Sequence, residues 1–287
     1  MNRVNPVIGE QFLRNKWIAQ VGIIGRAFGR CPIFFPPPAM CHGCSIFRRL
    51  KVDQIRAAEE MLMAWASQVG NYCERIDPSF WAEPLNASSN LGFLAAAFLA
   101  WNLAKSDKDW GPKLLAILLA AIGIGSFTFH TFATNWAALA DVGPITGFIL
   151  AYVYLTVTRF LNQPFWAGLL AIAAFFPYSI YLGKAVASQF GSLNGSIDYI
   201  PVVILIFAFA SLMWTAKPET GRNLLIGGLI LTLSLIFRTL DNAVCLRAPI
   251  GSHFIWHLLN AVLLWWVIRA LIRHNTSLSL ATARRQS

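Results

Sequence analysis

Five polar residues lie inside apolar stretches of the sequence and have types suited to hydrolytic chemistry. Ser126 and His130 are four positions apart, as are His253 and His257, and Asp141 lies a short distance after His130. Side chains four positions apart share one face of a helix. Two histidines at this spacing can bind one metal ion, and His130 could add a third imidazole nitrogen. Three protein ligands with a fourth position left for water are typical of a catalytic zinc site.

Each of these residues also has a purely structural interpretation. A lone histidine such as His130 is most often a hydrogen-bonded packing residue, and Ser126 could bond to a carbonyl group of its own helix. Asp141 could pair with a cation and take no part in chemistry. The repeated spacing of His253 and His257 favours the metal site, because two imidazoles on one helix face in lipid both need partners.

The elements that carry these residues are predicted to be membrane-spanning helices. The chain of 287 residues is 56% hydrophobic and only 13% charged, whereas soluble domains are about 25% charged. Helices are expected because backbone groups in lipid must bond internally. Seven apolar stretches are long enough to cross a bilayer, namely 85–104, 112–132, 136–161, 164–183, 199–215, 222–241 and 252–272. The sequence therefore predicts an all-α membrane protein, a bundle of seven transmembrane helices.

This topology brings the polar residues to one side of the membrane. The starts of the first, third and seventh stretches and the ends of the second and sixth face the same side. The polar residues near these ends are Glu83, Asn86, His130, Asp141, Arg238, Asp241, His253 and His257. The metal site is therefore predicted to lie in one leaflet. Arg238 and Asp241 are three positions apart, and we expect them to neutralise each other on one helix face.

Basic residues between the apolar stretches predict the orientation. Ten of them flank one side, at positions 105, 108, 113, 159, 217, 222, 269, 273, 284 and 285, and three flank the other, at 184, 238 and 247. The positive-inside rule then places the C-terminus in the cytoplasm and the start of the first stretch outside. Cys73 and Cys245 could form a disulfide if their side is an oxidising compartment.

The two ends of the chain differ from the apolar part. Residues 1–70 are predicted to be a weakly ordered basic extension, with Met61 or Met63 as an alternative start, and residues 274–287 a basic cytoplasmic tail. Residues 71–273 form the predicted seven-helix domain. The formal net charge of +10 is explained by loops and tails, and no basic stripe with interleaved aromatic residues indicates a nucleic-acid partner. Nothing in the sequence indicates an oligomeric state.

Several segments together resemble a known family. GSFTFH, Asp141 with the Gly143–Pro144 pair after it, and HFIWH resemble the alkaline ceramidases and the wider superfamily of seven-helix membrane hydrolases that includes adiponectin-receptor-like proteins. YCERIDPSFWAEPLNASSN, residues 72–90, strengthens the resemblance, which covers about residues 70–272. The ExxN and RTLD details resemble the bacterial ceramidase-like branch.

The resemblance implies an activity and a role for each residue of the cluster. His130, His253 and His257 would bind zinc, Ser126 would stand beside the metal, and Asp141 would handle the proton of a water molecule. The implied enzyme is a metal-dependent hydrolase that cleaves the amide bond of ceramide or another N-acyl lipid in the membrane. An ester substrate remains an alternative.

The resemblance also implies a calcium site formed by acidic residues before the first helix. Glu74 and Glu83 match two acidic positions of the family pattern, and Asp77 is a third candidate. Two features depart from the family pattern. Asn71 stands where the family has an aspartate, and Glu74 and Glu83 are closer together in the sequence than the corresponding acidic residues of the family.

Two other classes of protein place polar residues between membrane helices. A haem-binding electron-transfer protein needs one axial ligand on each side of the haem, so a histidine pair on one helix leaves one surplus. A seven-helix receptor or transporter could use the cluster as a ligand site or ion pathway. The sequence lacks the half-matching repeats and interrupted helix pairs of transporters, and its last apolar stretch has no central lysine for retinal.

Overall fold

The computed structural model describes residues 42–70 and 72–286 and divides the chain into two units, Met1–Asn71 and Tyr72–Ser287. The first unit contains helix α2 (His42–Ala66), so the described part of the predicted extension is largely helical. Residues 1–41, where the rest of that prediction falls, lie outside the described residues.

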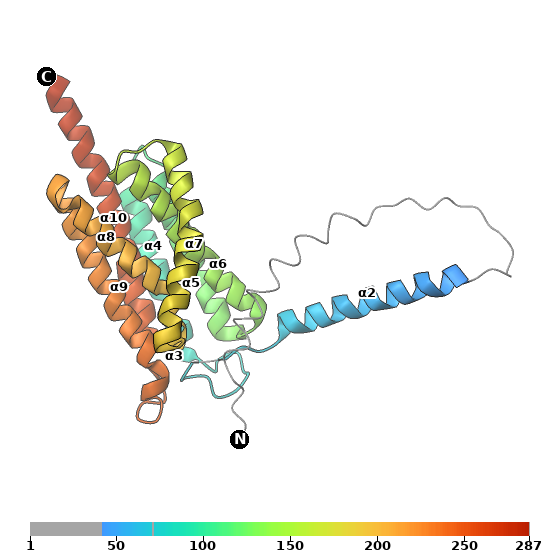
Figure 1. Cartoon of the computed structure of the whole chain (residues 1–287). Helices are drawn as coiled ribbons and strands as arrows, with labels where there is room; N and C mark the ends of the chain where they lie inside the picture. The colour runs from blue at the N-terminus through green and yellow to red at the C-terminus, as the bar shows by residue number, and fades with distance from the viewer. Residues whose placement is uncertain (1–41, 71, 287) are drawn as a thin grey trace. The chain divides into compact units, whose positions relative to one another are not determined.

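Seven helical segments of the second unit are long and apolar enough to cross a membrane. In order they are α3 with α4 (Pro84–Ser89 and Leu91–Ala104), α5 (Gly111–Phe132), α6 with the π-helical turn η1 (Asn135–Leu155 and Thr156–Phe160), α7 (Phe165–Phe190), the 3₁₀ segment η2 with α8 (Leu193–Tyr199 and Ile200–Ala216), α9 (Pro218–Val244) and α10 (His253–Gln286). Figure 1 shows α4 to α10 as a bundle. The predicted all-α bundle of seven transmembrane helices is confirmed.

The helix ends follow local sequence signals. Proline lies in the first turn of α5 and of α9, where its missing N–H costs nothing. Helix α5 ends at Phe132, and the next residue, Ala133, adopts a left-handed conformation with φ of 45°. Helix α6 begins directly afterwards, at Asn135, so the end of α5 lies beside the start of α6. Helix α10 continues to Gln286, well past the predicted end at 272, and includes most of the predicted tail.

The helices differ in how much of their surface faces the protein interior. In α5 and α10, half of the most apolar window is buried, whereas in α7 only 6% is buried. Helix α10 packs against both α4 and α9, and α5 packs against both α4 and α6. The two helices that carry the histidines are therefore interior helices, while α7 is the least buried of the seven candidate spans.

Ion pairing fixes the end of the bundle away from the histidines. The Asp109 carboxylate accepts hydrogen bonds from Arg159 Nε at 2.7 Å and Nη2 at 3.1 Å, and from Asn275 Nδ2 at 3.1 Å. Burial opposes the charge on Asp109, but its interactions with Arg159, the Gly111 backbone and Asn275 together outweigh burial and lower the pKa of this carboxyl. The loop before α5, the turn η1 and helix α10 are thereby joined.

Candidate metal centre

The three histidines predicted as ligands come together in the bundle interior. One ring nitrogen from each of His130, His253 and His257 lies within 4.8 Å of the others. The ring centroids are 4.6 to 5.2 Å apart, and the side chains are essentially inaccessible to solvent. Helices α5 and α10 thus form a group of side chains that could hold one metal ion.

The hydrogen bonds of these rings leave nitrogen atoms free at the centre. His130 Nδ1 lies 2.5 Å from Glu83 Oε2, and His257 Nδ1 lies 2.7 Å from Ser89 Oγ. Within the described part of the chain, His130 Nε2 and His253 Nδ1 are buried without a hydrogen-bond partner. Metal-binding histidines commonly have their second nitrogen held in this way. An unpaired buried nitrogen costs about 1–3 kcal/mol, so a bound cation fits these residues.

Glu83 is the main partner of His130. Its carboxylate accepts hydrogen bonds from Arg75 Nε and, at 3.0 Å, from Asn86 Nδ2. Arg75 also donates through Nη2 to the backbone carbonyl of His130 at 2.9 Å. Burial disfavours the charged form of Glu83, but its interactions with His130, Asn86 and Arg75 together outweigh this and lower its pKa. Glu83 was predicted as a calcium ligand, and the structure places it on the histidine cluster.

The other two acidic residues before the first span have different partners. Glu74 is buried, and its carboxylate accepts hydrogen bonds from the backbone N–H groups of Leu85 at 2.7 Å and Asn86 at 2.8 Å. Asp77 is exposed and accepts from the backbone of Ser79 at 2.7 Å. Across residues 42–70 and 72–286, no three acidic side chains lie close enough together to share a metal ion. Calcium binding stays a prediction.

Ser126 and Asp141 adjoin the histidines because α5 and α6 touch at Gly125. A Cβ atom added at Gly125 would lie 2.0 Å from the carbonyl oxygen of Ala140, so only glycine permits this approach. Ser126 Oγ lies 3.5 Å from His257 Nε2, and the Ser126 side chain also interacts with Asp141. Asp141 is half-buried and its Oδ1 atom has no partner among the described residues.

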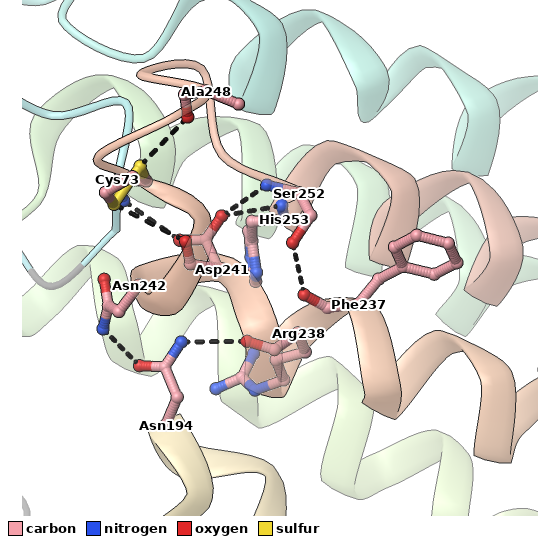
Figure 2. Close-up of a disulfide and its surroundings, with 10 residues drawn as sticks. Cys73, Asn194, Phe237, Arg238, Asp241, Asn242, Ala248, Ser252 and His253 are labelled. Carbon is pink, nitrogen blue, oxygen red and sulfur yellow. Dashed lines mark hydrogen bonds between the residues drawn. A yellow bond between two sulfur atoms is a disulfide. The ribbon is translucent and has the colours of Figure 1, made fainter.

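The predicted neutralisation of Arg238 by Asp241 is wrong. Figure 2 shows the Asp241 carboxylate pointing at backbone N–H groups: Oδ1 accepts from Ser252 at 2.7 Å and His253 at 2.9 Å, and Oδ2 accepts from Cys73 at 3.0 Å. The first N–H groups of a helix have no partner within it and favour negative charge. Asp241 therefore caps the N-terminus of α10, where the candidate ligand His253 is the first residue.

Arg238 is held by aromatic rings instead. Its guanidinium carbon lies 5.0 Å from the ring centroid of Trp256, 5.5 Å from that of Tyr199 and 6.0 Å from that of Tyr72. Such cation–π contacts replace part of the hydration lost on burial.

A disulfide between Cys73 and Cys245 joins residues 172 positions apart (Figure 2). The adjacent Tyr72 ring stacks on His253 with centroids 3.8 Å apart, and burial raises the pKa of its phenol to about 12. Gly251 packs against Cys73 and Asp241 with φ of 66°, and an added Cβ would lie 2.2 Å from Asp241 Oδ1. The disulfide thus ties the segment before the first span to the end of α9, and the backbone N–H of Cys73 donates to Asp241, which also accepts from the start of α10.

The sequence alone did not reveal Ser89 and Tyr72 as neighbours of the histidines. Both lie in the segment from residue 72 to 90 that carried the family resemblance, but their partners are on α10, far along the chain. Periodicity within one helix cannot find such contacts.

The fold and the histidine cluster define a class, a seven-helix membrane protein with a candidate metal centre at one end of the bundle. A family model described as Ceramidase matches residues 66–279. The chain therefore belongs to the Ceramidase family, as the resemblance predicted, and this membership supports a membrane hydrolase that acts on amides and takes a lipid substrate such as ceramide. Comparison with curated proteins finds no match to the chain.

Proposed function

We propose that the protein is a zinc-dependent hydrolase that cleaves the amide bond of ceramide or a related N-acyl lipid within the membrane. The supporting observation is the convergence of three buried histidines, two of which, His130 and His257, have their Nδ1 atoms held by Glu83 and Ser89. Three imidazole ligands suit zinc. Zinc bound there would supply a Lewis acid that polarises the amide carbonyl and acidifies water.

Asp141 and Ser126 have complementary roles in this proposal. Asp141 accepts a proton from the attacking water at its free Oδ1 atom and returns it to the amine nitrogen as the carbon–nitrogen bond breaks. Ser126 donates its hydroxyl hydrogen to the carbonyl oxygen as negative charge develops there. The products are a fatty acid, which receives the hydroxyl group of the water, and an amine, which receives its remaining hydrogen.

The proposed orientation places the site at the outer side of the membrane and the C-terminus in the cytoplasm. Six candidate spans separate Cys73 from Cys245, and an even number puts both cysteines on one side. Disulfides persist in oxidising compartments. The disulfide thus favours placing both cysteines at the outer side of the membrane, in agreement with the distribution of basic residues.

Two substitutions separate metal binding from proton transfer. We expect His257→Ala to lose both bound zinc and hydrolysis, because it removes a ligand. Asp141→Asn should keep zinc while kcat falls by about 100-fold or more, since an amide cannot accept the proton. The measurements are metal content of the purified protein and release of fatty acid from a short-chain ceramide. Full activity in Asp141→Asn would remove the proposed proton role.

Chelators distinguish the two metals implied for the family. A zinc-selective chelator should abolish hydrolysis, and added zinc should restore it. A calcium-selective chelator tests the calcium prediction separately: loss of activity that calcium alone restores would support it. Activity that survives complete removal of zinc would contradict the proposed zinc dependence.

A further inference from the structure

Arg238 lies beside the candidate metal centre in a cage of aromatic rings. Trp256, which contacts the guanidinium, is itself stacked on His253 with ring centroids 5.0 Å apart. Gly195, with φ of 74°, makes room for the same group, because a Cβ there would lie 2.8 Å from Arg238 Nη2. The ring of Trp256 therefore contacts both the Arg238 guanidinium and the candidate zinc ligand His253.

The charge of Arg238 has no counter-ion of its own. No ion pair within 4.0 Å links it to any carboxylate in the described part of the chain, and its buried Nε atom has no hydrogen-bond partner. The nearest helical carboxylate, Asp241, is occupied by backbone N–H groups. Asp141 interacts with Arg238 electrostatically without forming an ion pair.

Exposure indicates which of these groups a substrate can reach. The three histidines are fully buried, whereas Arg238, Asp141 and Tyr72 are each half-buried. Asp141 and Arg238 therefore have surface that a lipid could contact beside the buried histidine cluster. A substituent a few atoms from the amide would lie next to the guanidinium.

We propose that Arg238 binds an anionic group of the substrate, so that the preferred substrate is an N-acyl lipid with a carboxylate or phosphate close to the amide. This inference rests on the proposed amide hydrolysis. A partly desolvated cation without a counter-ion is costly in a membrane, and a guanidinium matches carboxylate and phosphate with paired hydrogen bonds. A neutral headgroup would leave the charge unpaired.

Four synthetic lipids with one acyl chain test the preference. N-dodecanoylglycine is compared with its methyl ester, and N-dodecanoylethanolamine with its phosphate monoester. The first pair tests a carboxylate and the second a phosphate. We expect the charged member of at least one pair to have a kcat/KM about 10-fold or more above its neutral partner, as a charge-assisted hydrogen bond provides. Equal values within both pairs would overturn the proposal.

Charge-removing variants show whether Arg238 is responsible. Arg238→Met keeps the length that contacts the aromatic rings, and Arg238→Gln keeps hydrogen-bonding capacity. Either should reduce the charged-to-neutral ratio to about 1 by weakening only the charged substrates. The exposed Arg247→Gln is the matched control and should keep the wild-type ratio. A folded neutral variant that still discriminates would contradict the assignment. If neither folds, Arg238→Lys decides, and its ratio should fall severalfold because lysine lacks the planar fork.

Binding to metal-free protein separates this inference from the proposed hydrolysis. The same four lipids are titrated calorimetrically into zinc-depleted protein in detergent micelles. Tighter binding of a charged lipid, lost in Arg238→Met, supports the anionic subsite even if no lipid is hydrolysed. Hydrolysis without any difference in binding or kcat/KM would leave the proposed function standing and reject the subsite.

Discussion

Among single residues that are not themselves candidate ligands, Glu83 contacts the metal centre through His130. Its carboxylate contacts His130 Nδ1 and at the same time accepts from Arg75 and Asn86. This fixes the ring orientation and leaves Nε2 of His130 facing the other histidines. Partners of this kind also make the ligand nitrogen more basic.

Replacing Glu83 should weaken metal binding without removing a ligand. We expect Glu83→Gln to lower zinc affinity by about 10–100-fold, because a neutral amide holds His130 less firmly. Competition with a coloured zinc chelator measures this change. Asp77→Asn is the matched control, since Asp77 is exposed and accepts from Ser79. Wild-type affinity in Glu83→Gln would show that the carboxylate has no role in holding the ligand.

The sequence predicted the site residues from their spacing within helices, and this worked for the histidine pair on α10. The spacing of His253 and His257 predicted one shared helix face, and the structure brings His130 of α5, the predicted third ligand, close to both. The same reasoning failed for Arg238 and Asp241, because backbone N–H groups from a loop and rings from other helices compete for them. Local spacing carries no information about such competitors.

At the level of helices, the contact between α5 and α6 at Gly125 positions Ser126 beside Asp141. Gly125→Ala should force these helices apart, since the new methyl group would overlap the Ala140 carbonyl. We expect a loss of stability of about 1–3 kcal/mol and a fall in kcat with zinc still bound. Thermal unfolding, metal content and hydrolysis are the measurements.

Gly143→Ala provides the control on the same pair of helices. A Cβ added at Gly143 has no heavy atom within 4 Å, so this variant should unfold at the wild-type temperature or slightly above. Equal unfolding temperatures and activities for the two variants would contradict the proposed close approach. Hydropathy predicted the seven spans from composition alone, but it could not distinguish Gly125 from Gly143, because helix contacts are not encoded in apolar periodicity.

Across the whole molecule, the disulfide links the segment before the first span to the loop after the sixth. Removing it in Cys73→Ser/Cys245→Ser should lower the unfolding free energy by about 2–4 kcal/mol, because the unfolded chain regains the freedom of a long loop. Zinc affinity should fall as well, since Tyr72 stacks on His253. Thermal unfolding and zinc titration test this, with wild-type protein treated with reductant expected to match the variant. Unchanged stability and affinity would show that the link is dispensable.

The ring closed by Cys73 and Cys245 also constrains biogenesis. A nascent chain emerges from its N-terminus, and the ring contains six candidate spans. Cys73 therefore cannot pair with Cys245 until the sixth helix has been synthesised. Both histidines of α10 are translated after Cys245, so covalent closure and assembly of the ligand set fall at the last stage of synthesis. A chain that ends before residue 245 therefore lacks the partner of Cys73 and cannot close this ring.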